Sequence, residues 1–322
     1  MADPIFKPEV LEMLSRLEQK YQPLGQDLAS YLEGLLYSDF LNYWDYIHLD
    51  TLLSLQNPRT KIPDEEIFIM YHQITELYFK LCLHEYTQIG QDPAPTAAML
   101  TMRVGRINRY FENLINSFEV MVDGMDQKEF LKFRMALMPA SGFQSVQYRM
   151  IEISSTDLRN LTDKARREAL GLQTTHEEMF GCIYWKEGAT EAATGAKTLT
   201  LLQFEDKYSE QLIAHAREYQ HKNILSVFKR LSTEEQQNEK LISHLKELDS
   251  NVNVNWPLMH YKSAVRYLQR DPDVIAATGG TNWQKYLPPK FQKRIFYPNL
   301  WTQEEMDNWG KGWVNSIIGE VD

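Results

Sequence analysis

The chain is dominated by long stretches with the periodicity of α-helices, and this feature most constrains its fold. Apolar residues recur at spacings of three and four, short turns interrupt the stretches, and almost no segment alternates apolar and polar residues as a half-buried strand does. The 322 residues, 43% of them apolar, are enough to bury a large core. The sequence therefore predicts an all-α protein in which residues 1–322 form a single domain.

Two regions of this predicted domain differ from the rest. Residues 1–35 are expected to form an amphipathic helical arm that faces solvent, and residues 156–250 a more polar helical excursion that acts as a small helical subdomain. Neither region has the composition of a disordered linker or contains an internal repeat.

Charge and cysteine content narrow the class of partner. The formal net charge is -10 without any block rich in lysine or arginine, which argues against nucleic acid and anionic membranes as partners. No run approaches the roughly 18 apolar residues of a membrane span, and the first residues lack the pattern of a signal peptide. Cys82 and Cys182 are too few for a disulfide framework or a zinc site. We expect a cytoplasmic protein that binds a small molecule.

A candidate site lies on a helix predicted to begin after Pro63, with Asp64 as its N-cap. One apolar stripe is expected to be the core face, and it consists of Ile67, Met70, Tyr71, Ile74, Leu77, Tyr78 and Leu81. Roughly 120° away lies a second cluster, Phe68, His72, Thr75 and Phe79. This second face contacts either another helix, with His72 as a hydrogen-bonded core histidine, or a ligand.

Arg134 is a second anomaly, because it falls within an apolar helical face that carries Phe130, Phe133 and Leu137. Its guanidinium either reaches solvent, pairs with a structural glutamate, or binds a substrate carboxylate through its planar fork of donors. The turn that follows, with Ser141 and Gly142, is small and polar enough to admit a ligand close to the backbone.

The third candidate is His260, on a helix predicted to have Asn255 as its cap, Pro257 in its first turn, and an end near Leu268. A histidine among small and apolar side chains meets the needs of an axial haem ligand, although a core histidine has similar surroundings. The sequence Thr278-Gly279-Gly280, which follows this helix, can form a tight loop over the polar head of a ligand.

Taken together and in this order, these segments resemble the tryptophan 2,3-dioxygenase family of haem-dependent aromatic oxygenases. The resemblance rests on YWDYIHLDTLL at 43–53, DEEIFIMYHQ at 64–73 with Glu76-Leu77, Phe133-Arg134, PASGFQSVQYR at 139–149, the His260 helix and Thr278-Gly279-Gly280. These blocks span residues 43–281, whereas residues 156–250 contribute almost nothing to the resemblance.

The resemblance implies a large helical haem-binding domain of the tryptophan/indoleamine dioxygenase type that assembles as a homotetramer. It implies haem b with His260 as the axial ligand of the iron, and His72 as the catalytic residue that hydrogen-bonds the indole N–H. The implied substrate contacts are the carboxylate anchor Arg134, the loop residue Thr278, the pocket residues Phe68, Phe130 and Ser141, and three residues lent by a neighbouring subunit, Tyr43, Tyr46 and Ile47.

The implied reaction inserts both atoms of O2 across the indole C2–C3 bond of L-tryptophan and gives N-formylkynurenine, the first step of the kynurenine route of tryptophan degradation. Two alternatives stay open: a haem-dependent monooxygenase that hydroxylates tyrosine or a substituted indole, and a non-catalytic haem sensor or carrier. A sensor of gas alone needs no carboxylate clamp, so the presence of Arg134 and Thr278 favours an enzyme.

Overall fold

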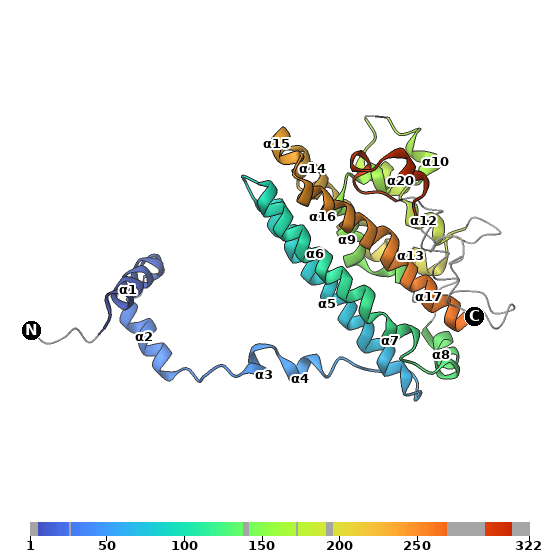
Figure 1. The fold of residues 1–322 in the computed structure, drawn as a ribbon. Coiled ribbons are helices and arrows are strands. Elements are labelled where there is room, and N and C mark those ends of the chain that lie inside the picture. The colour runs from blue at the N-terminus through green and yellow to red at the C-terminus, as the bar shows by residue number, and fades with distance from the viewer. Residues whose placement is uncertain are drawn as a thin grey trace, which may run out of the picture. The chain divides into compact units, whose positions relative to one another are not determined.

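The computed structural model describes residues 6–25, 27–137, 142–171, 173–190, 196–268 and 294–310. Within these ranges the regular structure is helical, and the β-type pairing consists of isolated bridges, Thr162 with Ile183 and Thr190 with Lys197 (Figure 1). The all-α prediction is therefore confirmed. No helix of the described part has the length and apolar character needed to cross a membrane.

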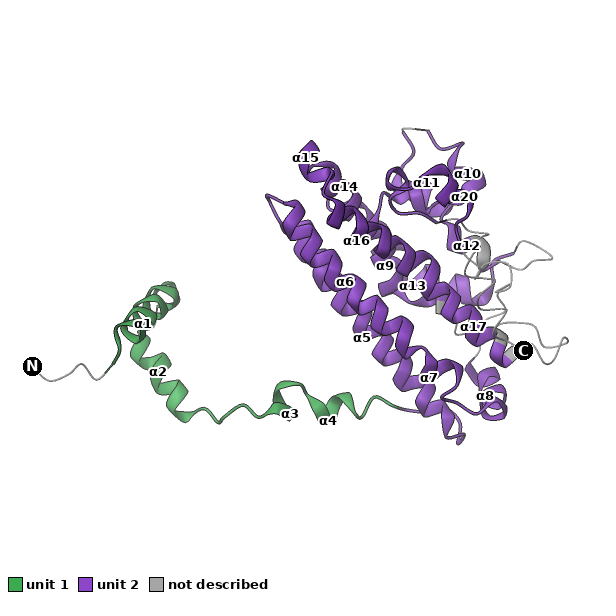
Figure 2. Ribbon diagram, viewed as in Figure 1, with its two compact units in different colours: residues 1–56 green, residues 57–322 purple. Residues whose placement is uncertain are grey.

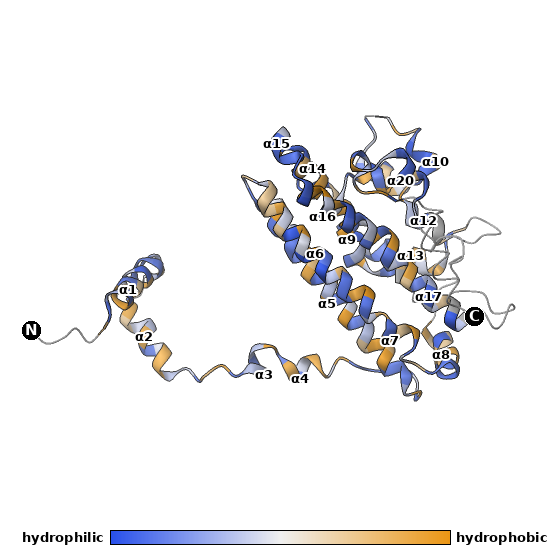
Figure 3. Cartoon of the chain, in the orientation of Figure 1, coloured by the Kyte–Doolittle hydropathy of each residue, from blue (hydrophilic) through white to orange (hydrophobic). Residues whose placement is uncertain are grey.

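The chain divides into two compact units, residues 1–56 and 57–322 (Figure 2). The helices of the first unit are α1 (Pro8–Tyr21), the short 3-10 helix η1 (Gln22–Leu24), α2 (Leu28–Tyr37), α3 (Tyr43–Tyr46) and α4 (Leu49–Leu52). None of these helices buries a residue, although α2 is strongly apolar (Figure 3). That residues 1–322 form a single domain stays a prediction.

The second unit contains the long helices and a series of short ones. Its α-helices are α5 (Asp64–Gln91), α6 (Ala97–Ser117), α7 (Glu119–Val122), α8 (Gln127–Phe133), α9 (Val146–Ser155), α10 (Lys164–Arg167), α11 (His176–Gly181), α12 (Tyr184–Gly188), α13 (Leu199–Tyr219), α14 (Ile224–Lys229), α15 (Thr233–Gln236), α16 (Glu239–Ser250), α17 (Trp256–Leu268) and α20 (Gln303–Asp307). The 3-10 helices are η2 (Arg134–Leu137), η3 (Gly142–Gln144), η4 (Leu158–Leu161) and η7 (Pro298–Leu300), and η5 (Asn251–Asn255) is a π-helical turn.

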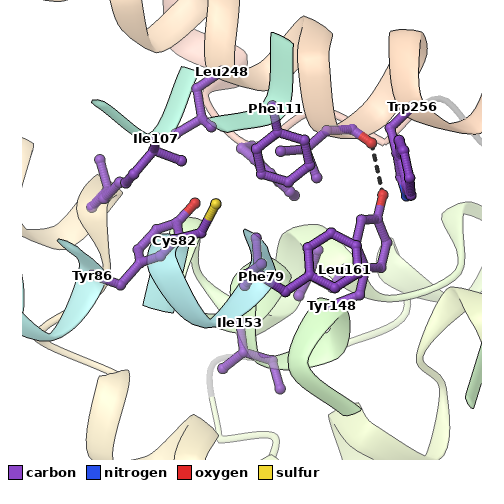
Figure 4. Packing of buried hydrophobic residues seen from close by; sticks show 14 of the residues in the cluster. Phe79, Cys82, Tyr86, Ile107, Phe111, Tyr148, Ile153, Leu161, Leu248 and Trp256 are labelled. Atoms are coloured by element: carbon purple, nitrogen blue, oxygen red, sulfur yellow. Dashed lines mark hydrogen bonds between the residues drawn. The ribbon is translucent and has the colours of Figure 1, made fainter. Parts of the chain in front are cut away.

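The core of the second unit lies between helices that pack in the order α16, α6, α5, α9 and α13. Helix α6 shows why this packing forms, because its buried residues recur at helical spacing at Leu100, Val104, Ile107, Phe111 and Leu114. Phe79 of α5, Tyr148 of α9 and Trp256 of α17 meet in the same core (Figure 4). Residues 156–250 contribute α13 and α16 to this packing.

The prediction of the core face of α5 was wrong for four of its seven residues, which are exposed: Met70 39%, Ile74 46%, Leu77 49% and Leu81 45%. Tyr71 is buried as predicted, and Ile67 and Tyr78 are partly buried against the core. From Tyr71 the buried residues continue along the helix as Thr75, Phe79, Cys82, Tyr86 and Ile89. Both faces of this helix carry apolar side chains, so periodicity cannot select between them, and packing against α6 and α9 decides.

Asp64 is not the N-cap of α5, as the sequence suggested, but its first helical residue. Its carboxylate accepts a hydrogen bond from the backbone N–H of Asp126 at 2.5 Å, and its own backbone N–H donates to Glu129 Oε2 at 3.3 Å. These two bonds join the start of α5 to α8, the helix that leads to Arg134.

Asn255 is likewise not a helix cap, because α16, η5 and α17 form one continuous helical segment from Glu239 to Leu268. Pro257 has no N–H to donate, so a helix that continues through it loses one backbone hydrogen bond. The wider π turn directly before Pro257 accommodates this loss. The helix is described as far as Leu268, so its predicted end near this residue stays a prediction.

A close approach between α6 and α16 yields a stability prediction. A Cβ atom at Gly105 would stand 2.9 Å from the His244 ring, which is held by a 3.0 Å hydrogen bond from Nδ1 to the carbonyl of Thr101. Because the ring or the helices must move, we expect Gly105→Ala to lower the free energy of unfolding by about 1–3 kcal/mol. Urea unfolding measures this, with Gly181→Ala as a control that meets no atom within 4 Å. Equal stability of the two variants would contradict the prediction.

Candidate functional site

His260 lies in the first turns of α17 and is held between two aromatic rings. Its ring centroid is 4.6 Å from that of Trp256, one turn earlier, and 4.6 Å from that of Phe118. Its Nδ1 lies 3.1 Å from the carbonyl oxygen of Trp256. A carbonyl can only accept, so Nδ1 carries the proton and Nε2 presents a lone pair.

The surroundings keep His260 neutral. Burial lowers its pKa to about 4, the hydrogen bond to Trp256 opposes this shift, and the nearby charge of His72 adds to it. At neutral pH the imidazole is therefore uncharged, as a metal ligand must be.

His72 lies on α5 and, like His260, carries its proton on Nδ1. Its Nδ1 donates to the carbonyl oxygen of Phe68 at 2.7 Å, and the Phe68 ring packs against the imidazole with centroids 4.1 Å apart. Desolvation lowers its pKa below the ordinary value of 6.5, although its side chain is exposed. The lowered pKa leaves the imidazole uncharged at neutral pH.

Aromatic rings connect the two histidines. From His260 the contacts run to Phe118, then to Tyr71 with centroids 5.7 Å apart, and from Tyr71 to His72 at 6.4 Å. The two imidazoles are near enough for the charge of His72 to lower the pKa of His260. The structure thus brings together two of the residues that the sequence singled out, from helices nearly 190 residues apart in the chain.

Arg134 begins the 3-10 turn η2 directly after α8, and only 2% of its surface is exposed. Desolvation lowers its pKa, but a guanidinium stays protonated at any physiological pH. The preceding residue, Phe133, packs against Phe68 with centroids 5.8 Å apart. Arg134 is therefore the neighbour in sequence of a residue that packs against the ring covering His72.

Phe130 completes this cluster and joins the three helices that carry it. Its ring lies 6.3 Å from that of Phe68 on α5 and 4.5 Å from that of Tyr267 on α17. Aromatic contacts thus join α5, which carries His72, α8, which leads to Arg134, and α17, which carries His260.

The remaining predicted site residues are not part of this cluster in the described structure. Ser141 and Thr278 lie outside the described residues. Tyr43 and Tyr46 belong to the first unit, where 71% of the surface of each is exposed, and Ile47 follows them. Their place in a pocket stays a prediction.

The sequence reasoning did not single out Tyr71, Trp256 and Tyr267 as site residues, although all three contact one. Spacing could have identified Trp256, because it precedes His260 by one helical turn, and Tyr71, because it adjoins His72. Tyr267 offered no such signal, since its contact with Phe130 is a tertiary one.

The residues present fit a haem. A haem iron needs one neutral imidazole from the protein together with apolar and aromatic surroundings, and His260 with Phe118 and Trp256 supplies these. The described residues contain no group of three or more His, Cys, Asp or Glu side chains that could hold a metal ion. The described residues therefore provide no metal centre built only from these side chains.

Comparison with known proteins shows what this chain is similar to. The model of the tryptophan 2,3-dioxygenase family matches residues 34–179, a range that contains His72 and Arg134 and ends before His260. A relative from Ruegeria sp. (strain TM1040), named tryptophan 2,3-dioxygenase, is 40% identical over 42% of this chain and 47% of its own length. A second tryptophan 2,3-dioxygenase, from Sorangium cellulosum (strain So ce56), is 40% identical over 48% of this chain and 38% of its own length.

The chain thus spans less than half the length of these two relatives. A third tryptophan 2,3-dioxygenase, from Bacillus cereus (strain ZK / E33L), is 28% identical over 84% of this chain and 95% of its own length. Residues 34–179 thus match the model of the tryptophan 2,3-dioxygenase family, and the chain is similar over most of its length to a tryptophan 2,3-dioxygenase.

Proposed function

We propose that the protein is a haem-dependent dioxygenase that cleaves the indole C2–C3 bond of L-tryptophan with O2 and forms N-formylkynurenine. The observation that carries this proposal is the pair of neutral imidazoles, each with its Nδ1 bonded to a backbone carbonyl, joined by aromatic rings and accompanied by a buried arginine. The names of the relatives support the same activity. No separate observation favours a hydroxylase or a gas sensor.

In this proposal His260 holds haem b through Nε2, and the haem supplies the activation of O2 when it is bound. The Trp256 carbonyl fixes the tautomer and orientation of the imidazole, as partners of metal-binding histidines commonly do. Phe118 and Trp256 keep the ligand in apolar surroundings.

The substrate is recognised by groups at the other end of the cluster. The guanidinium of Arg134 binds the carboxylate of the amino acid, and burial strengthens this charged contact. His72 Nε2 accepts the hydrogen bond of the indole N–H, while Phe68 and Phe130 form an apolar wall for the ring. Ser141 and Thr278 are proposed to contact the polar head of the substrate.

The role of His72 is to orient the indole and polarise its N–H. Its lowered pKa makes it a weak base, and the reaction as proposed needs no strong one. The contribution of His72 is therefore that of one hydrogen bond in the bound state.

The assembly we infer is a homotetramer in the cytoplasm. Tyr43, Tyr46 and Ile47 would be lent to the pocket of a neighbouring subunit, which accords with a first unit whose helices bury no residue of their own. Two free cysteines accord with a reducing compartment.

Replacement of His72 tests its proposed role. We expect His72→Ala to lower kcat/KM for L-tryptophan by about 10-fold without abolishing turnover, because one hydrogen bond of roughly 1–1.5 kcal/mol is lost. His84→Ala, which removes an exposed histidine of the same helix, is the matched control and should match the wild type. Complete loss of activity in His72→Ala would contradict a purely orienting role.

The pH dependence of kcat/KM follows from the direction in which the pKa of His72 is shifted. A lowered pKa means that His72 is neutral above its ordinary value of 6.5 and becomes protonated only below it. The protonated ring can no longer accept the indole N–H, so the acid limb of kcat/KM that depends on His72 should lie below pH 6.5 and be absent in His72→Ala.

The proposed function is tested by adding haem to the purified protein and recording its absorption spectrum, then supplying L-tryptophan and a reductant in air. We expect a Soret band and the formation of N-formylkynurenine. A Soret band without consumption of tryptophan would indicate a haem carrier or sensor, and a hydroxylated product would indicate a monooxygenase.

A further inference from the structure

Asp249 is a fully buried carboxylate at the end of α16 on which two distant parts of the chain converge. From the C-terminal segment it accepts the backbone N–H groups of Phe296, at 2.9 and 3.0 Å, and of Tyr297, at 3.1 Å, and the indole N–H of Trp301 at 3.0 Å. From its own helix it accepts Nδ2 of Asn253 at 2.7 Å.

These N–H donors stabilise the carboxylate inside the protein. Burial raises the pKa of Asp249 to about 6, and the hydrogen bonds from Phe296, Asn253, Tyr297 and Trp301 act in the opposite direction. At neutral pH the group is therefore ionised, and each of its hydrogen-bond partners in the described part of the chain is an N–H donor.

Asn253, the partner on the helix, lies in the middle of the π turn η5. The side-chain amides of the asparagines in this turn are only partly hydrogen-bonded. Asn251 Nδ2, Asn253 Oδ1 and Asn255 Oδ1 are buried and have no hydrogen-bond partner among the described residues. The turn is instead supported from outside, by Asp249 on one side and by the Tyr148 hydroxyl, which donates to the Val252 carbonyl at 2.7 Å (Figure 4).

The π turn determines where His260 points. Each residue of a helix adds a rotation of about 100°, so the extra residue of a π turn rotates every later side chain by about that angle. His260 follows the turn by five residues in the same continuous helix. If the turn relaxed into α-helix, the imidazole would rotate together with Trp256 and lose its contact with Phe118.

We propose that Asp249 is a positioning residue for His260: it holds the π turn through Asn253 and couples it to the C-terminal segment 296–301. This inference rests on the proposed role of His260 as a haem ligand.

The test compares three variants that act on different parts of this arrangement. Asp249→Asn keeps the volume but turns an amide N–H₂ toward N–H donors, and Asn253→Ala removes only the contact with the π turn. Thr156→Val is the matched control, because the Thr156 hydroxyl donates to the Phe296 carbonyl at 2.6 Å and thus holds the same C-terminal segment without contacting the turn.

Two readouts besides activity report on the ligand: haem affinity, from titration of the apoprotein, and the iron–histidine stretching band in the resonance Raman spectrum of the ferrous protein. We expect haem affinity to fall about 10-fold or more in Asp249→Asn and by a smaller factor in Asn253→Ala. The iron–histidine stretching band should be shifted in both variants. Thr156→Val should lower the Tm and leave affinity and band unchanged.

The outcomes separate this inference from the proposed function. A wild-type protein that binds no haem would refute the role of His260. Haem binding by the wild type, with an unchanged affinity and band in Asn253→Ala, would overturn the role of Asp249, as would equal shifts in Thr156→Val. If Asp249→Asn does not fold, the comparison of Asn253→Ala with its control Thr156→Val still tests whether Asp249 positions His260.

Discussion

Replacing His260 by alanine is expected to give a folded protein that no longer retains haem. The Nε2 lone pair of His260 is the proposed protein ligand of the iron, and the Nδ1 bond to the Trp256 carbonyl keeps that lone pair available. The variant removes the ligand from a site between two aromatic rings, where alanine offers no donor atom. The ratio of haem to protein after purification, from the Soret absorbance, measures the effect.

The control for this variant is His221→Ala, which removes an exposed histidine and should leave haem content unchanged. Circular dichroism should show the same helix content for both variants. Addition of imidazole to His260→Ala provides a second check, because a free imidazole in the vacated space can supply the missing nitrogen. Full haem content in His260→Ala without imidazole would refute the assignment.

Replacing Arg134 by alanine is expected to weaken the binding of L-tryptophan strongly. Loss of one partner of a desolvated charge pair costs about 2–5 kcal/mol, which corresponds to a rise in Kd of roughly 30-fold to several thousand-fold. Arg134 meets the condition of desolvation, since only 2% of its surface is exposed. Titration of the haem-loaded variant with L-tryptophan measures this Kd.

A substrate analogue separates this role from general damage. Tryptamine lacks the carboxylate, so wild type and Arg134→Ala should bind it with similar affinity if Arg134 acts on that group. Lys132→Ala, which removes an exposed basic residue of α8, should bind L-tryptophan as the wild type does. An unchanged affinity for L-tryptophan in Arg134→Ala, or an equal loss for tryptamine, would contradict the anchor role.

The helical class and the place of Arg134 within an apolar face were predictable from the sequence because both depend on local patterns, whereas the pattern left open whether the guanidinium reaches solvent. Helical periodicity in long segments such as α6 needs no knowledge of their neighbours, and an arginine within an apolar face is visible in one helical turn.

What the sequence could not show depends on contacts between distant residues. Helix α5 has two apolar faces, and only packing against α6 and α9 selects the one with Phe79. Asn255 has the form of a helix cap, but the preceding helix α16 continues into it through a π turn. The convergence of Phe296 and Asn253 on Asp249 joins residues more than 40 positions apart, so no local pattern reveals it.

The measurement that tests the central claim most directly is turnover of L-tryptophan by the haem-loaded, reduced protein under ¹⁸O₂, with mass spectrometry of the product. Arg134 and His72 are proposed to hold the indole so that both atoms of one O2 molecule enter it. We therefore expect N-formylkynurenine that carries two ¹⁸O atoms. A hydroxylated product with a single ¹⁸O atom, or a haem-loaded protein that leaves tryptophan unchanged, would contradict the claim.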